Sequence, residues 1–292
     1  MQRSEFRCFH RLRVRWVEVD MQKIVFNAHY LMYVDTAMMD YWRALALPYE
    51  DSMALLGGEL YVKKATLEYH ASARLDDTLD IGLRCERVGN SSVLFQAGIF
   101  RGNTLLVSAE LVYVFADPVT QTPRPVPPAL RTVFSSFEAG TAMAEVRTGD
   151  WDTLGRDAAH VRTAVFVREQ GIAPELELDA LDAGAVHAVL YNRLAQPIAA
   201  GRLLQPEPGV ARIGRMAVDR SLRGGRWGRR LLDVLVELAR ARGDTRIELH
   251  AQSSAETFYA RAGFVARGAP YEEAGIAHTT MVQMLSPEEL FN

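Results

Sequence analysis

One stretch near the start of the chain carries apolar side chains at helical spacing: Tyr30, Tyr33, Val34, Ala37, Met38, Tyr41, Trp42 and Leu45. This spacing predicts one long helix with a single apolar face, which we expect to pack in a core and to end at Pro48. A helix that is apolar along its whole length must bury that face against another element.

Strand-like runs surround this helix. Four follow it and are separated by turn-forming residues; they cover residues 60–69, 78–88, 93–101 and 105–116. A further strand is expected before it, because Leu12, Val14 and Trp16 alternate with arginines. We therefore predict an α+β domain in which an antiparallel sheet wraps around the long helix.

The composition changes sharply after residue 116. Five prolines between Pro118 and Pro128 stiffen the chain and remove sheet donors, and a small, polar stretch follows them. We place a first domain at residues 1–135, a linker at 136–144 and a second domain at 145–292. The second domain alternates helix-like and strand-like segments, and its long helix is expected from about residue 227 to 242. It is predicted to be a mixed α/β domain.

Composition restricts the class of protein. The 292 residues are 49% hydrophobic and 24% charged, which is typical of a globular chain with enough apolar material for two cores. Neither half has the positive excess of a general nucleic-acid binder, and no run approaches the ~18 apolar residues of a membrane span. Cys8 and Cys85 are too few for a metal cluster and suit a reducing compartment. We expect a cytoplasmic protein that binds neither metal, nucleic acid nor membrane.

A candidate site lies where the first strand meets the long helix. Asp20 stands shortly before the helix start, where a carboxylate commonly serves as an N-cap or turn residue. A catalytic role is the alternative, because the free N–H groups and the dipole of a helix N-terminus stabilise negative charge on a carbonyl oxygen. Asp20 would then face the acyl group that carries this carbonyl. The residues alone leave both roles open.

Several blocks in this half resemble the hot-dog thioesterases, with the YbgC and 4-hydroxybenzoyl-CoA thioesterase type as the closer match. They lie in order within about residues 6–134, at 13–47, 61–69 and 73–77. The resemblance implies acyl-CoA thioester hydrolysis, with Asp20 as nucleophile or general base and the backbone N–H of Asn27 as the oxyanion contact. It also implies a homo-oligomer, because hot-dog domains bury sheet edges and helices against a second copy.

Two features depart from the family pattern. Gln22-Lys23 replaces the glycine-containing pair before the helix, which removes the most permissive residues from the turn. Asn27 stands where many relatives have histidine, and His29 follows about 200° further around the helix. A second interpretation therefore stays open, in which this domain only binds acyl-CoA esters or serves a structural role.

The second candidate site lies at the start of the helix expected near residue 227. An apolar strand runs into a turn containing glycines and then into this helix, whose N-terminus presents free N–H groups to an anion. Arginines surround the turn: Arg220, Arg223, Arg226, Arg229 and Arg230. Strand, turn and helix in this order predict a diphosphate-binding site. Solvated arginines and a nucleic-acid patch are the competing interpretations.

This segment resembles motif A of the GNAT acetyltransferases, and the resemblance, closest to the ElaA-like branch, covers about residues 147–285. Arg223 and Gly228 fit the pattern Arg-x-x-Gly-x-Gly, although Arg226 takes the place of the inner glycine. The resemblance implies that coenzyme A is bound here, as acetyl-CoA or another acyl-CoA substrate, next to a splayed strand whose backbone pairs with the pantetheine. The residues implied are Met216, Val218, Arg223, Gly224, Gly225, Arg226, Gly228 and Arg229.

The segment around Tyr259 resembles motif B of the same family. Tyr259 then matches the residue that protonates the departing CoA thiolate, although a tyrosine on a short helix can equally be a core residue. Glu248 and His250 are candidates for the base that takes the acceptor's ammonium proton, or they form a satisfied core pair. Asp179, Asp182 and His187 would shape an acceptor pocket or equally be surface loop residues.

Both halves point to coenzyme A as the shared ligand. We predict a bifunctional enzyme that hydrolyses acyl-CoA in its first domain and transfers an acetyl or other acyl group from CoA to an unidentified amine in its second. The first alternative keeps only the GNAT domain catalytic and makes the hot-dog domain an oligomerisation or acyl-CoA-binding module. A further alternative makes both halves CoA-binding regulators.

Overall fold

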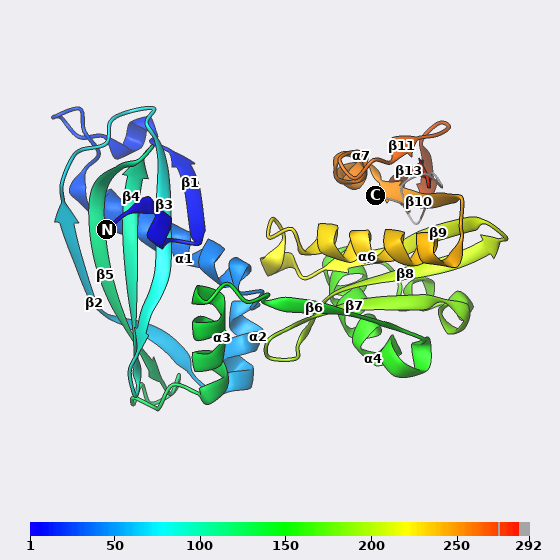
Figure 1. The fold of residues 1–292 in the computed structure, drawn as a ribbon, viewed down its shortest axis with the longest axis horizontal. Helices are drawn as coiled ribbons and strands as arrows, with labels where there is room; N and C mark the ends of the chain where they lie inside the picture. The colour runs from blue at the N-terminus through cyan, green and yellow to red at the C-terminus, as the bar shows by residue number, and fades with distance from the viewer. Residues whose placement is uncertain (274, 286–292) are drawn as a thin grey trace. The chain divides into compact units, whose positions relative to one another are not determined.

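The computed structural model describes residues 1–273 and 275–285, and the chain divides into two compact units, Met1–Met143 and Ala144–Asn292 (Figure 1). Each unit has its own sheet and its own buried apolar residues. Among the described residues, no helix is long and apolar enough to cross a membrane.

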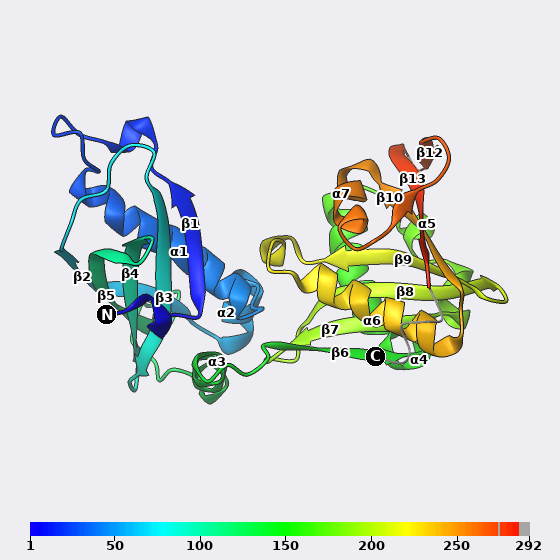
Figure 2. The same ribbon diagram turned by 45° about the horizontal axis from the view of Figure 1, so that its top comes forward.

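The first unit is built on an antiparallel sheet with the strand order β1-β3-β4-β5-β2. Its strands are β1 (Cys8–Arg13), β2 (Glu59–Tyr69), β3 (Thr78–Val88), β4 (Ser92–Arg101) and β5 (Thr104–Ala116). Helix α1 (Asn27–Ala44) packs against this sheet and buries the predicted apolar stripe from Tyr30 to Trp42 (Figure 2). The predicted sheet around a central helix is confirmed.

Local details of the first unit differ from the sequence prediction. The alternation does not extend to Trp16, because β1 ends at Arg13 and Trp16 opens a short helical turn with its side chain 79% exposed. Helix α1 ends at Ala44, before Pro48, and a second helix, α2 (Tyr49–Leu56), follows that proline. Pro48 is the N-cap of α2, a position where a missing N–H costs little.

Helix α3 (Pro128–Glu138) occupies residues 136–138, which we expected in the linker. The last proline of the cluster stands at the first helical position, where its fixed φ suits a helix and its missing N–H would have no partner. Leu130, Val133 and Phe134 are buried. At the other end, Glu138 Oε1 accepts hydrogen bonds from the Tyr41 hydroxyl at 2.7 Å and the Cys85 N–H at 2.8 Å. These contacts make α3 part of the first unit.

The second unit has a mixed sheet with the order β11-β13-β10-β9-β8-β7-β6, and β12 pairs with β13. The strands are β6 (Ala144–Gly149), β7 (Val186–Asn192), β8 (Pro197–Glu207), β9 (Val210–Val218), β10 (Arg246–Gln252), β11 (Val265–Ala266), β12 (Tyr271–Glu273) and β13 (Ile276–Met284). Of the strand pairs, β9 with β10 is parallel and the others are antiparallel.

Helices cover both faces of this sheet. They are α4 (Trp151–Arg162), which continues as a π-helical segment over Thr163–Glu169, α5 (Pro174–Glu177), α6 (Trp227–Arg242) and α7 (Glu256–Ala260). Ala200 of β8 packs in a core with α4, whereas a Cβ on the next residue, Gly201, would meet Leu231 and Leu235 of α6. Because neighbouring strand residues face opposite ways, α4 and α6 lie on opposite faces, and the predicted mixed α/β domain is confirmed.

Removing the Tyr41 hydroxyl should loosen the docking of α3. The Tyr41 side chain is fully buried, and the Tyr41→Phe variant leaves Glu138 without one donor. We expect the free energy of unfolding of the first unit to fall by about 1–2 kcal/mol in urea titrations. Tyr61→Phe, on half-buried β2, is the control and should change it by less than about 0.5 kcal/mol. Equal stability of Tyr41→Phe and the wild type would contradict this role.

Candidate functional site

The pairing between the two central strands of the second unit stops partway. β9 and β10 pair in parallel from Val210 with Arg246 to Ile213 with Leu249, and beyond that point they separate. On its other side β9 bulges against β8, because two residues, Arg215 and Met216, oppose a single one. Arg215 has a positive φ of 54° in this bulge. The backbone that follows, up to Val218, therefore faces a gap between strands.

A cavity of about 1510 Å³ fills this gap and reaches the start of α6. Most residues that the resemblance implied line it: Met216, Val218, Arg223, Gly224, Arg226, Gly228, Arg229 and Tyr259. Gly225 is not among the lining residues. Its N–H donates to the Leu222 carbonyl at 3.2 Å, and a Cβ there would lie 2.6 Å from the Trp227 ring. Gly225 therefore shapes the turn, and the others form the cavity wall.

Helix α6 begins on a turn with two residues in the left-handed region, Gly224 at φ 86° and Arg226 at φ 65°. Arg226 stands where we expected a glycine, and this conformation costs a non-glycine residue about 1–2 kcal/mol. Gly228 lets the helix approach β9 closely, because a Cβ there would lie 3.2 Å from Val218 Cγ2. The first turn of α6, with N–H groups that lack intrahelical acceptors and a partial positive charge, thus lies at the cavity wall.

The Arg223 side chain is engaged by protein partners. Its guanidinium donates to both carboxylate oxygens of Glu169 at 2.7 Å, and its Nε donates to the Val218 carbonyl at 3.2 Å. The hydrogen bonds from Arg223 hold the pKa of Glu169 below its ordinary value. Arg223 thereby ties the π-helical segment after α4 to the glycine turn, a role that its place in the sequence motif did not indicate.

Tyr259 lies on α7 with its side chain 9% exposed. Its ring packs edge-on against Phe258 and Phe264, with centroid separations of 4.9 and 6.0 Å. Burial raises the pKa of Tyr259 to about 12, so the phenol keeps its proton at neutral pH. Both interpretations of this residue are thus compatible with its surroundings: the ring packs in a core and the residue also lines the cavity.

Beyond the gap, the cavity is lined by polar side chains on the α4 face of the sheet. Arg202 of β8 pairs with Gly214, and Arg212 of β9 pairs with Glu248, so these side chains share one face with His250. Arg202, Arg212 and His250 line the cavity, whereas Glu248 is not among its lining residues. The α6 face holds the glycine turn, so the gap connects two chemically different compartments.

His250 contacts a small aromatic and polar cluster, and its side chain is exposed. Its Nδ1 is hydrogen-bonded to the Tyr271 hydroxyl, and Tyr271 stacks on His278 with ring centroids 6.1 Å apart. Partial burial, followed by the charge of Arg212, lowers the pKa of His250, so its imidazole is neutral at pH 7. A neutral imidazole can accept a proton, and His250 lines the cavity whereas Glu248 does not, so His250 is the base candidate within the cavity.

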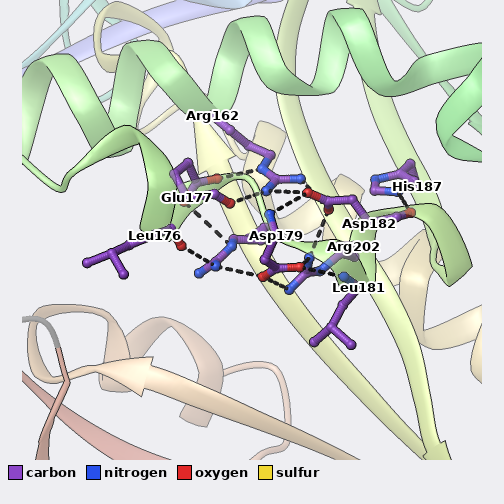
Figure 3. A network of polar contacts seen from close by, with 9 residues as sticks. Arg162, Leu176, Glu177, Asp179, Leu181, Asp182, His187 and Arg202 are labelled. Carbon is purple, nitrogen blue, oxygen red and sulfur yellow. Dashed lines mark hydrogen bonds and ion pairs between the residues drawn. The ribbon is translucent and has the colours of Figure 1, made fainter.

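Buried ion pairs hold the segment of residues 174–184 over this compartment (Figure 3). Arg162 of α4, 1% exposed, donates to Glu177 at 2.5 Å and to Asp182 at 2.7 Å. Arg202 donates to Asp179 at 2.6 Å and to Asp182 at 2.8 Å. Asp179 lines the cavity and Asp182 lies buried behind it.

The charges in this network are set by a balance between burial and hydrogen bonding. Burial opposes ionisation of Asp182, but the hydrogen bonds from Arg162 and Arg202 outweigh it and lower its pKa. For Glu177, burial prevails and raises the pKa. His187 is fully buried with Nε2 at 2.9 Å from the Asp182 carbonyl, and burial lowers its pKa. Glu177, Asp179 and Arg202 lie at the cavity wall. Arg162, Asp182 and His187 are not among the lining residues and anchor the cover of the cavity.

In the first unit, Asp20 lies on a tight turn between the bridged residues Val19 and Val25. Its N–H donates to the Ile24 carbonyl at 2.9 Å, and its Oδ1 accepts the Gln22 N–H at 2.8 Å. Lys23 has a φ of 61°, a conformation that glycine adopts without strain. One carboxylate oxygen of the half-buried Asp20 is therefore engaged in a hydrogen bond within the turn.

Asn27 is the first residue of α1, where the backbone N–H has no intrahelical acceptor. Its side chain is exposed, and the Tyr69 hydroxyl donates to its carbonyl at 3.2 Å. His29 packs edge-on against Phe26, and its buried Nδ1 has no hydrogen-bond partner among the residues that the structure describes. Asp20 and the N-terminus of α1 thus belong to one short, tightly folded segment.

Glu18 fixes this segment and was missed from the sequence. It is 2% exposed, and its carboxylate accepts hydrogen bonds from Arg15 and from the Tyr33 hydroxyl at 2.8 Å. Its carbonyl accepts the Phe26 N–H at 2.9 Å. Burial opposes ionisation of Glu18, but the hydrogen bonds from Arg15 outweigh it and lower the pKa. The one available signal was a carboxylate in an apolar run, which also fits a strand residue.

Arg212 and Tyr271 were also missed. The position of Arg212 on a predicted strand, two residues before Gly214, placed it on one face of the sheet, but its neighbours on β10 follow only from a long-range parallel register. Tyr271 lies on the short strand β12, which no periodic pattern marks. Within residues 1–273 and 275–285, no group of three or more His, Cys, Asp or Glu residues is placed to hold a metal ion.

Comparison with known families gives one match in each of the two units. Residues 22–108 match the model of the thioesterase superfamily, and residues 156–285 match that of the acetyltransferase (GNAT) domain. The chain therefore belongs to both families, with a hot-dog thioesterase domain in its first unit and a GNAT acetyltransferase domain in its second.

Similar proteins come from both families. "Uncharacterized N-acetyltransferase YjcF" of Bacillus subtilis is 33% identical over 44% of this chain and 91% of its own length. "Acyl-CoA thioester hydrolase YbgC" of Escherichia coli is 32% identical over 42% of this chain and 92% of its own length. A solved acyl-CoA N-acyltransferase from Pseudomonas aeruginosa is 31% identical, covering 48% of this chain and 99% of that chain, with a TM-score of 0.44.

Removing Arg162 should destabilise the second unit strongly. The Arg162→Met variant keeps the side-chain volume but leaves Glu177 and Asp182 buried with less compensation. We expect the free energy of unfolding of this unit to fall by about 3–5 kcal/mol in urea titrations. Arg156→Met on the same helix is the control, because Arg156 is 95% exposed and should contribute less than about 0.5 kcal/mol. Similar effects of the two substitutions would contradict a structural role for the network.

Proposed function

We propose that the second unit transfers an acetyl or other acyl group from coenzyme A to an amine. The observation that supports this most strongly is the cavity that runs from the first turn of α6 through the gap between β9 and β10. The helix N-terminus suits the CoA diphosphate, and the backbone from Met216 to Val218, which has no strand partner on the β10 side, suits the amides of the pantetheine. The thioester would then lie in the gap, with the amine on the α4 face.

In the proposed chemistry, one residue accepts a proton from the acceptor amine and another donates a proton to the departing CoA sulfur. The amine nitrogen forms a bond to the thioester carbonyl carbon, and the carbon–sulfur bond then breaks. His250 first accepts one proton from the ammonium, directly or through water, so that the neutral amine can attack. The Tyr259 hydroxyl donates a proton to the departing sulfur, and the second proton that the nitrogen loses on collapse to the amide restores the phenol through solvent. The neutral imidazole of His250 and the protonated phenol of Tyr259 are the forms that these roles require.

We further propose that the first unit hydrolyses acyl-CoA. The Asp20 carboxylate would attack the thioester carbonyl or activate water, and the Asn27 N–H at the start of α1 would stabilise the developing oxyanion. The geometry that supports this is the tight turn that holds Asp20 next to that helix start. We expect the chain to form a homo-oligomer through this unit, and its free, buried Cys8 and Cys85 suit the reducing cytoplasm.

One observation favours a second candidate role for the first unit. Asp20 already accepts a hydrogen bond within its own turn, which is what a purely structural carboxylate does. On this alternative, only the GNAT domain is catalytic and the hot-dog domain binds acyl-CoA or assembles the oligomer. The substitution Asp20→Asn separates the two candidates, because asparagine keeps an oxygen for the Gln22 N–H but loses the charge.

Two variants should dissociate the two activities. We expect Asp20→Asn to reduce amine-independent thiol release from a panel of acyl-CoAs by about 100-fold or more, because a carboxylate acting as base or nucleophile is lost. Tyr259→Phe should reduce only the amine-dependent release, to a similar degree, while its ring still packs against Phe258 and Phe264. Asp76→Asn, in an exposed loop, is the matched control for Asp20.

The outcomes separate the proposals. Equal amine-independent release by the wild type and Asp20→Asn would exclude Asp20 as an essential group and support the binding-module alternative. Release that requires an amine for every acyl-CoA tested would do the same. Absence of turnover for every acyl-CoA, with and without amines, would contradict both enzymatic proposals.

The rate of acyl transfer should depend on the protonation of His250. The base form exists above its pKa, which burial and Arg212 place below the ordinary value of about 6.5. We expect kcat to be constant near neutral pH and to fall as the pH drops through that lowered pKa. Glu248, Tyr271, Glu273 and His278 also face this imidazole.

The His250→Gln variant tests this assignment. It should lower kcat by about 100-fold and remove the acidic limb of the pH profile. Stopped-flow measurements of thiol release over about pH 5–8, roughly 1.5 units either side of the ordinary histidine value, would resolve this limb. An unchanged acidic limb in this variant would assign the titration to another group. Circular dichroism at each pH provides the control for folding.

A further inference from the structure

We call the polar part of the cavity on the α4 face of the sheet the acceptor compartment. Among the described arginines of its wall, Arg212 is the one that no close carboxylate holds. Arg212 lines the cavity with its side chain 37% exposed, and its acidic partner, Glu248 Oε2, lies 4.0 Å away. Glu248 gives its other oxygen to Arg246 at 3.1 Å. The buried Nε of Arg212 has no hydrogen-bond partner among the residues that the structure describes.

The other arginines of this compartment also have a buried Nε without a hydrogen-bond partner among the described residues, but close carboxylates hold their guanidinium groups. Arg202 donates to Asp179 at 2.6 Å, and Arg215 donates to the same carboxylate at 3.0 Å and to the Leu176 carbonyl at 2.8 Å. Both serve the cover of the cavity. Arg212 is therefore the guanidinium of this wall that is most available to a ligand, and a guanidinium binds a carboxylate with two parallel hydrogen bonds.

The cavity wall that holds Arg212 also carries a negative charge. Glu273 lines the same cavity, and the charges of Arg212 and Glu273 act in opposite directions on both His250 and Tyr271. The imidazole thus lies within the electrostatic reach of Arg212 and of two carboxylates, Glu273 and Glu248. A ligand with an ammonium and a carboxylate complements the pair of Arg212 and Glu273, whereas a polyamine would place a second cation next to Arg212.

We propose that the amine acceptor also carries a carboxylate, that is, an amino acid or a related amino carboxylate. Arg212 binds the carboxylate, Glu273 attracts the ammonium, and His250 accepts a proton from the ammonium so that the neutral amine can attack the thioester. The exposed leucines Leu176 and Leu181 line the remaining wall and suit an apolar substituent. This inference rests on the proposed acyl transfer and names its substrate class.

Matched pairs of amines test the proposal on the full chain with Asp20→Asn, which removes background hydrolysis. The pairs are leucine and 3-methylbutylamine, phenylalanine and 2-phenylethylamine, and 4-aminobutanoate and butylamine, each with acetyl-CoA. We expect kcat/KM for the better amino carboxylates to exceed that for their carboxylate-free partners by 10-fold or more. Arg212→Gln should bring this ratio close to one, mainly through KM. Arg212→Lys should restore part of the ratio, because lysine returns the positive charge but not the two parallel hydrogen bonds of a guanidinium.

Controls make each outcome decisive. Arg267→Gln removes an exposed arginine outside the cavity lining and should leave the ratio as in the wild type. Equal or faster acetylation of the carboxylate-free amines, or a ratio that Arg212→Gln leaves unchanged, would overturn the proposal while acyl transfer itself stands. Should no amine be acetylated, the proposed function fails, and calorimetric titration of the CoA-saturated chain with each amino carboxylate decides the site. Binding that Arg212→Gln abolishes supports it, and no binding overturns it.

Discussion

The second unit depends on the separation of β9 from β10 after Ile213. Two neighbouring parallel strands would normally continue to pair, because unpaired backbone groups in a sheet interior are costly. Here the bulge at Arg215 and Met216 turns β9 away, and the cavity takes the place of the missing pairs. A ligand with amide groups can restore those hydrogen bonds, which supports the proposal that pantetheine binds along this strand. The same separation opens a passage from the α6 face to the α4 face.

Arg215 links this backbone feature to the charged network over the cavity. A residue at positive φ within the bulge directs its guanidinium to Asp179 and to the Leu176 carbonyl. Arg162 and Arg202 hold the same cover from α4 and β8. Buried ion pairs of this kind contribute little net stability compared with apolar packing, but they fix geometry because each partner is costly to leave alone. We therefore interpret the network as the device that holds residues 174–184 at the acceptor compartment.

Local sequence patterns predicted most of the longer helices and strands, but they did not predict the contacts between them. The stripe from Tyr30 to Trp42 was predictable because its period is a property of one helix. The prolines before α3 were misleading, since the same residues that end a strand also begin a helix. The pairing of Arg212 with Glu248 joins two strands that the whole of α6 separates in sequence, and no local period carries such information. Glycine motifs located the turn before α6, but the engagement of Arg223 by Glu169 required the fold.

The two candidate sites differ in whether the residues of a single unit enclose them. In the second unit, the helix N-terminus, the gap and the polar wall all line one cavity within one unit. In the first unit, the start of α1 is open, with Asn27 exposed, Phe26 48% exposed and Met21 fully exposed. An oxyanion contact is strongest where water is excluded, because a low local dielectric strengthens each hydrogen bond to the developing charge. Hydrolysis at Asp20 would therefore need a further surface over this segment, and a second copy of the first unit is the partner that its family membership favours. Acyl transfer in the second unit carries no such requirement.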